Sequence, residues 1–125
     1  ENNYYAIFIL AEDNKLYISD HLMDHVIISL GKPVLSAGEM TFTKENDEML
    51  ISAISNHSLG YCPEPESWKL VQKALTKAGL GPPSAFTTEF IYRKCDKCAA
   101  VNIVKEDWYV CAICDSDLDH KWNII

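Results

Sequence analysis

The sequence predicts an α+β fold in which an antiparallel β-sheet comes first, one amphipathic helix covers it, and a cysteine-rich module ends the chain. Short apolar runs with period-two alternation fill the first half, one stretch with helical spacing follows, and two C-x-x-C pairs lie near the C-terminus. With 125 residues the chain has the length of one ordinary domain and can bury its own core. We expect residues 1–85 to form the sheet and helix. Residues 86–125 are expected to form a strand, the cysteine module and a tail, and the whole chain is expected to be one compact unit.

Four or five short strands with tight connections are typical of an antiparallel sheet. The segment 4–10 is rich in aromatic and β-branched residues, and a polar turn joins it to 16–19, which predicts a hairpin. In 49–55 the alternation of side chains places Ile51 and Ile54 on opposite faces. The predicted strands are 4–10, 16–19, 25–30, 39–43 and 49–55.

One amphipathic helix is predicted after Pro65, because proline suits the first turn of a helix. Apolar side chains recur there at helical spacing, and three lysines form the opposite face. Glycines and the Pro82-Pro83 pair then stop the helix. We interpret the lysine row as a solvated face, with contact to an acidic partner as the alternative. The apolar positions are Trp68, Val71, Leu75 and Ala78, and the lysines are Lys69, Lys73 and Lys77.

The net charge of −7 is unevenly spread, with −8 in residues 1–66 and +1 in residues 67–125. An acidic chain repels phosphate backbones, which disfavours broad nucleic-acid binding. The basic cluster of Arg93, Lys94 and Lys97 is the exception, and it supports a local nucleic-acid contact as one alternative. No apolar run approaches the roughly 20 residues that span a bilayer, so we expect no membrane partner.

The five cysteines divide into two C-x-x-C pairs and one single residue, Cys62. In a reducing compartment paired C-x-x-C units indicate metal ligands, and an odd cysteine is then no difficulty, so we predict a cytoplasmic protein. A predicted strand, 86–94, leads directly into the first pair.

The two pairs form the motif C-x2-C, twelve residues, C-x2-C, which is typical of a zinc site. One tight turn aims each pair of sulfurs at a single ion, and we expect a hairpin of 100–104 with 108–110 to bring the pairs together. Four thiolates close a tetrahedron with bonds of about 2.3 Å and leave no position for water or substrate. We therefore predict one structural Zn²⁺. Iron in a four-thiolate site and a redox-active dithiol are the alternatives. The predicted ligands are Cys95, Cys98, Cys111 and Cys114.

These cysteines and their spacing resemble the zinc ribbon family over residues 94–118. Many ribbons have glycine after each pair, whereas this chain has Ala99 and Asp115. Aspartate tolerates a positive φ better than alanine does, so we expect the turn at Ala99 to be the less regular one. The whole chain looks like small bacterial proteins that end in a zinc ribbon and have no assigned activity. Because ribbons occur in nucleic-acid binders, enzymes and scaffolds, the resemblance does not determine the function.

The loop 56–68, with the sequence NHSLGYCPEPESW, permits three interpretations. The first is structural: side-chain turns and prolines shape the entry to the helix, and Cys62 is a small buried residue. The second is a recognition surface for a peptide, small ligand or protein. The third is a catalytic pair in which Cys62 is the nucleophile and His57 its base. The residues of the recognition surface would be Asn56, His57, Ser58, Tyr61 and Glu64.

The sequence as a whole favours a non-catalytic, zinc-containing binding or adaptor protein, in which the loop 56–68 recognises a protein or small ligand. The alternatives are a cysteine-dependent hydrolase or transferase that uses Cys62 and His57, and a zinc ribbon that contacts nucleic acid. A second metal site is a weaker hypothesis, because no further ligand is obvious beside the histidines. It would draw on His21, His25, His57 and Cys62.

Overall fold

The computed structural model describes residues 3–124. The chain divides into two compact units, residues 1–89 and residues 90–125. The boundary therefore lies four residues after the one predicted from the sequence, and the packing of both parts into one body stays a prediction. None of the helices within residues 3–124 has the length and apolar character needed to cross a bilayer.

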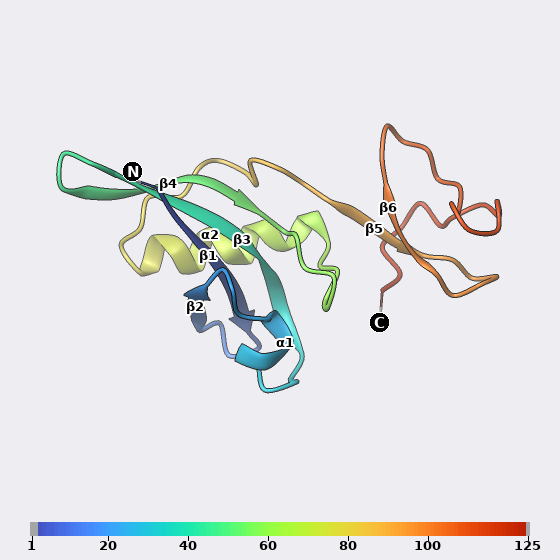
Figure 1. Ribbon diagram of the computed structural model, residues 1–125, viewed down its shortest axis with the longest axis horizontal. Coiled ribbons are helices and arrows are strands. Elements are labelled where there is room, and N and C mark those ends of the chain that lie inside the picture. Colours follow the sequence, from blue (N-terminus) through green and yellow to red (C-terminus); the bar gives the residue numbers. More distant parts are fainter. Residues whose placement is uncertain (1–2, 125) are drawn as a thin grey trace. The chain divides into compact units, whose positions relative to one another are not determined.

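The first unit contains a four-stranded antiparallel sheet with the order β2-β1-β3-β4 (Figure 1). Its centre is the long pairing of β1 with β3, in which Phe8 lies opposite Gly38. The predicted antiparallel sheet is confirmed, although the strands are longer than expected. They are β1 (Asn3–Ala11), β2 (Leu16–Asp20), β3 (Val34–Glu45) and β4 (Glu48–Ser55).

The predicted helix is present as α2 (Trp68–Lys77), preceded by the 3₁₀ turn η1 (Pro65–Ser67). It covers one face of the sheet, where its buried side chains meet a core that includes Phe8 and Met40. Burial of these apolar side chains is the main stabilising contribution of the helix. The buried helix residues are Trp68, Val71 and Leu75, and Lys69, Lys73 and Lys77 are exposed. Ala78 is exposed, so the predicted apolar stripe was one residue too long, since the helix ends there and Gly79 follows with a φ of 81°.

The predicted strand at 25–30 is wrong, because this segment forms the one-turn helix α1 (His25–Ile28). The Asp24 carboxylate caps the turn by accepting a hydrogen bond from the Val26 N–H at 2.7 Å. At the other end Leu30 and Gly31 take positive φ, and the Gly31 N–H donates to the Val26 carbonyl at 2.9 Å. This Schellman-type end satisfies backbone carbonyls at the end of the helix by local hydrogen bonds. The apolar run in the sequence does not by itself indicate such an end.

A β-bulge in β4 overturns the predicted alternation of its side chains. Thr41 pairs with Ala53 whereas Phe42 pairs with Ile51, so Ser52 is the extra residue. As a result Ile51 and Ile54 are both buried, although they are three residues apart. The bulge therefore brings to the core two side chains that strict alternation would separate.

The predicted strand 86–94 is confirmed only in its last four residues, which form β5 (Ile91–Lys94). The beginning of the segment belongs to the first unit, where Phe86 is buried and Thr87 bonds to Ile54 through both backbone and side chain. The Phe86 ring centroid lies 4.9 Å from that of Trp68. Tertiary packing on β4 thus replaces the strand ladder that the alternation suggested.

The second unit contains a two-stranded antiparallel hairpin of β5 and β6 (Val101–Val104). The sequence predicted that 100–104 pairs with 108–110, but β6 pairs with β5, and Val110 forms only an isolated bridge with Asp117. The small core of this unit surrounds two of the cysteines. Its buried residues are Cys95, Val104, Cys111 and Leu118.

Candidate metal centre

Four cysteine sulfurs of the second unit form a cluster, with all four Sγ atoms within 4.8 Å of one another. The sulfurs of Cys95 and Cys114 are 3.6 Å apart, and those of Cys98 and Cys111 are also 3.6 Å apart. A disulfide would bring two sulfurs to about 2.05 Å, whereas the edge of a tetrahedron with 2.3 Å metal–sulfur bonds is about 3.8 Å. The arrangement is therefore that of four ligands around one metal ion such as zinc.

The two C-x-x-C turns have the same backbone structure. The Ala99 N–H donates to the Cys95 carbonyl at 2.9 Å, and the Asp115 N–H donates to the Cys111 carbonyl at 3.0 Å. Both residues take a positive φ, 67° at Ala99 and 62° at Asp115. The expectation of a less regular turn at Ala99 is therefore wrong, because the backbone hydrogen bonds hold the alanine in the left-handed region despite its Cβ atom.

The repeat extends to the first cysteine of each pair. The Cys95 N–H donates to the Ala100 carbonyl, and the Cys111 N–H donates to the Ser116 carbonyl, each at 2.8 Å. Each turn is thus closed by two backbone hydrogen bonds at corresponding positions. Two matching turns that face each other present two sulfurs each to one point, which the sequence spacing predicted.

Asn102 on β6 holds the second turn in place and supports its buried sulfur. Its side-chain oxygen accepts the Ala112 N–H at 2.9 Å, and its amide nitrogen donates to the Cys111 Sγ at 3.4 Å. The Asn102 amide, and then the N–H groups of Cys114 and Ile113, lower the pKa of the Cys111 thiol to about 6. The thiolate that binds a metal is therefore the favoured form of Cys111 at neutral pH.

The pKa shifts of Cys114 and Cys98 indicate that the sulfurs of the cluster affect one another's protonation. The Ser116 side chain, 3.2 Å from the Cys114 Sγ, lowers the pKa of Cys114. At Cys98 the Ala100 N–H acts to lower the pKa, but desolvation and the neighbouring sulfurs outweigh it, and the pKa is raised. Four thiolates at this spacing repel one another, so a bound cation removes the repulsion and favours full deprotonation.

Arg93 belongs to the scaffold of this unit and not to an exposed basic surface. It is 7% exposed, and its guanidinium donates to the carbonyls of Tyr92, Asp119 and His120 at 2.8 to 3.0 Å. It also lies 5.6 Å from the ring centroid of Tyr109. Arg93 is therefore too buried to contact a phosphate backbone. Of the predicted basic cluster, Lys94 and Lys97 are exposed.

The loop 56–68 lies in the first unit, and two of its five predicted recognition residues are buried. Asn56 and Ser58 are 0% and 2% exposed, and the Asn56 amide donates to the Pro63 carbonyl at 2.9 Å. The Ser58 hydroxyl accepts the Tyr61 N–H at 3.3 Å. These contacts are those of the structural interpretation, in which polar side chains shape the turn. His57, Tyr61 and Glu64 are partly exposed, and their role in recognition stays a prediction.

Cys62 has the surroundings of a buried, unreactive thiol. It is 4% exposed, its φ is 47°, and its Sγ donates to the Leu59 carbonyl at 3.5 Å. Burial raises the pKa of the Cys62 thiol, which disfavours the thiolate that a nucleophile requires. The Nδ1 atom of His57 lies 3.3 Å from the Glu39 carboxylate. These observations count against the alternative in which Cys62 and His57 form a catalytic pair.

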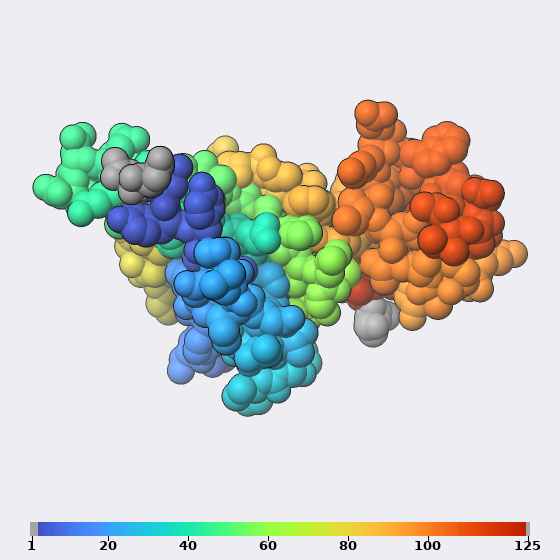
Figure 2. Space-filling model, in the orientation of Figure 1, coloured from blue at the N-terminus to red at the C-terminus, as the bar shows by residue number. Residues whose placement is uncertain are grey.

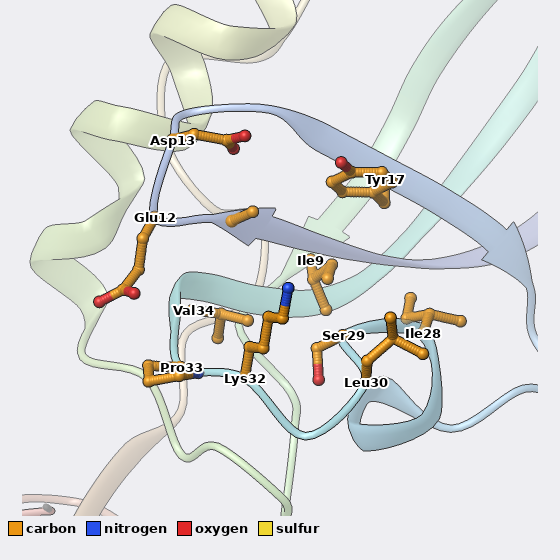
Figure 3. Close-up of a pocket in the computed structure, with 11 residues that line it drawn as sticks. Ile9, Glu12, Asp13, Tyr17, Ile28, Ser29, Leu30, Lys32, Pro33 and Val34 are labelled. Carbon is orange, nitrogen blue, oxygen red and sulfur yellow. The ribbon is translucent and has the colours of Figure 1, made fainter.

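Two surface cavities of the first unit were not predicted from the sequence. The first, of about 340 Å³, is lined by apolar side chains that include Ile9, Ile28 and Val34. Figure 3 shows the Lys32 side chain among the apolar side chains that line this pocket, and Glu12 on the turn between β1 and β2. The second, of about 240 Å³, is lined by residues that include His21, His25, Glu39 and His57. The sequence hypothesis of a second metal site grouped His21, His25 and His57 with Cys62, whereas this pocket brings the three histidines together with Glu39 and without Cys62.

Comparison of the chain with protein-family models, with curated proteins and with solved structures gives no match. The functional proposal therefore rests on the geometry and chemistry of the sites described above.

Proposed function

We propose that the protein is a non-catalytic, zinc-containing binding or adaptor protein. A single structural Zn²⁺ is held by four thiolates in a zinc ribbon that spans residues 94–118, and the loop 56–68 recognises a protein or small ligand. Cysteine sulfurs that are 3.6 Å apart, rather than joined as disulfides, support a reducing compartment such as the cytoplasm. The zinc ligands are Cys95, Cys98, Cys111 and Cys114.

The observation that carries the proposal is the pair of matching turns with four sulfurs at tetrahedral spacing. An ion with four protein thiolates has no open position at which to bind a substrate or activate water, so it acts by holding the chain together. The N–H groups that donate to the Cys111 sulfur stabilise negative charge on it, as expected for a permanent ligand. The small core of the second unit consists partly of these cysteines, which couples folding of the unit to the ion.

The metal is tested on reduced, purified protein by elemental analysis, with one zinc per chain as the expected result. Substitution with Co²⁺ should give the absorption of a tetrahedral thiolate site, and Cys111→Ser should abolish it. Cys62→Ser is the matched control, because Cys62 lies outside the cluster, and it should leave the spectrum unchanged. Iron in place of zinc, or a spectrum that indicates a water ligand, would refute the structural-zinc assignment.

The recognition role is supported by how the loop presents its outer residues on a rigid base. Leu59 is 69% exposed, and the His57 side chain is 35% exposed. In the same loop the buried Asn56 and Ser58 hold the turn through hydrogen bonds. Exposed side chains on a turn that is already ordered lose little conformational entropy when they bind, which favours recognition.

The recognition role is tested by comparing the partners that the wild-type protein and a loop variant capture from the source organism's extract. We expect the double variant His57→Ala and Leu59→Ser to lose partners that the wild type retains. Lys73→Ala, on the exposed face of α2, is the matched control and should retain them. Equal capture by all three proteins would show that the loop is not the recognition surface.

A further inference from the structure

Three of the four histidines of the chain line one pocket of the first unit, whereas the cysteine cluster belongs to the second unit. The pocket has a volume of about 240 Å³. His21 comes from the segment between β2 and α1, and His25 is the first residue of α1. Glu39 comes from β3, and His57 from the loop after β4. The segment 20–33 and the loop around residue 60 are neighbours on the surface (Figure 2), where Val26 leaves no room for a Cβ atom on Gly60.

Two of the histidines already have a partner of the kind that orients metal ligands. The Nε2 atom of His25 lies 2.8 Å from the Gly38 carbonyl, and the Nδ1 atom of His57 lies 3.3 Å from Glu39 Oε1. A neutral imidazole that donates one N–H to a carbonyl or carboxylate carries its lone pair on the other nitrogen, and metal-binding histidines are usually held in this way. In this arrangement each of the two imidazoles thus has an acceptor beside one of its ring nitrogens.

The charge of the pocket selects a cation over an anion. Glu39 and Asp24 line it beside the histidines, and two carboxylates repel a phosphate or carboxylate ligand. Imidazole together with carboxylate is a donor set that suits Zn²⁺, Ni²⁺ and Cu²⁺, whereas Ca²⁺ and Mg²⁺ prefer oxygen alone. The acidic sequence around the pocket, with a charge of −8 in residues 1–66, also attracts divalent cations.

We propose that this pocket binds one divalent transition-metal ion through His21, His25 and His57, with Glu39 as an oxygen ligand or as the partner that orients His57. The site is separate from the cysteine centre, and it differs from the weaker sequence hypothesis in its fourth member. Cys62 does not line the pocket, and Glu39 takes its place. Three imidazoles around an ion leave a position for water or an exogenous ligand, unlike the four thiolates.

The histidine side chains must rotate to close on an ion. Within residues 3–124 the cysteine cluster is the single group that brings three or more such ligand atoms within 4.8 Å of one another. The side chains of His21, Glu39 and His57 are 55%, 56% and 35% exposed, so they have room to change rotamer. Because this rearrangement opposes binding, we expect the histidine pocket to bind metal more weakly than the thiolates do.

The test uses full-length protein loaded with one equivalent of Zn²⁺, which is then titrated with Ni²⁺ in a calorimeter. We expect one further site, with zinc retained on the protein as measured with a metallochromic indicator. His57→Gln and His21→Gln should each weaken Ni²⁺ binding by about 10-fold or more. His120→Gln is the matched control, because His120 stacks on Tyr109 at 4.2 Å in the second unit, and it should leave the Ni²⁺ affinity unchanged.

Paramagnetic broadening in the wild-type protein gives a second measurement that does not depend on the folding of any variant. Ni²⁺ should broaden the imidazole signals of His21, His25 and His57 and spare that of His120. Each of three results would overturn the proposal. They are the absence of a second site, a Ni²⁺ affinity of the His57 and His21 variants equal to that of the wild type, and release of zinc as Ni²⁺ binds. Glu39→Gln tests whether the pocket binds a cation or an anion, since loss of the carboxylate should weaken Ni²⁺ binding. Stronger binding of inorganic phosphate than of Ni²⁺ would contradict a cation site.

Discussion

The two cysteine turns differ at one position in a way that predicts a stabilising substitution. Ala99 and Asp115 occupy the same place in their turns and take nearly the same φ, 67° and 62°. Alanine has no side-chain group that compensates for the left-handed conformation, which disfavours an L-residue by about 1–2 kcal/mol. Replacing Ala99 with glycine removes this strain without changing any hydrogen bond of the turn.

The gain is smaller than the strain, because glycine also makes the unfolded chain more flexible, by roughly 0.4–1 kcal/mol. The difference predicts that Ala99→Gly stabilises the metal-bound second unit by about 0.5–1 kcal/mol. Since folding of the unit is coupled to metal, this gain should appear as zinc affinity higher by about 2- to 5-fold. A competition titration with a chromophoric chelator measures an effect of that size.

Ala100→Gly is the matched control for this prediction. Ala100 is the next residue in the chain, does not have a positive φ and packs against the core of the second unit. Glycine there adds flexibility and relieves no strain, so it should lower the zinc affinity slightly. If Ala99→Gly binds zinc no more tightly than the wild type while Ala100→Gly behaves as expected, the argument from backbone strain is wrong.

Three further predictions follow from particular contacts. Asn102→Ala removes the amide that donates to the Cys111 sulfur, so the zinc affinity should fall by about 10-fold, and a Co²⁺ titration of wild type and variant measures it. Burial raises the pKa of Cys62, so its thiol should resist iodoacetamide at pH 8.5 in the zinc-loaded protein and react once urea unfolds the chain; rapid reaction in the native protein would contradict the burial. The same shift means that Cys62 favours the folded state at neutral pH, and that this contribution is lost as the pH rises through the raised pKa. A Cβ atom at Gly38 would lie 1.8 Å from the Ser55 carbonyl oxygen, so Gly38→Ala should destabilise the first unit by about 3 kcal/mol or more in urea unfolding, and a loss below 1 kcal/mol would show that the strands separate easily there.

The parts of the fold that were predicted correctly are those set by short-range patterns. The hairpin of β1 and β2 and the helix α2 follow from alternation, turn residues and helical spacing, which act within a few residues. The segment at 25–30 was predicted incorrectly because its short-range pattern, an apolar run, is compatible with a strand or a helix. The Asp24 cap and the glycine end decide between the two.

The cysteine cluster was predictable because each pair forms its turn locally and the motif specifies four ligands of one chemical type. The role of Arg93 was not predictable, since its partners Asp119 and His120 are 26 and 27 residues away in the sequence. A charged residue in a basic run is usually exposed, and only the packing of this unit shows that the guanidinium is buried against backbone carbonyls.

The sequence by itself determined the grouping of the four cysteines, the antiparallel sheet and the helix that covers it, because local spacing and periodicity specify all three. Tertiary structure alone decided the bulge that buries Ile51 with Ile54 and the position of Glu39, in place of Cys62, beside the three histidines of one pocket. The physical reason is that register and loop packing depend on contacts between segments far apart in the chain. Such contacts are made only when the sheet has formed, and no pattern within a single segment records them.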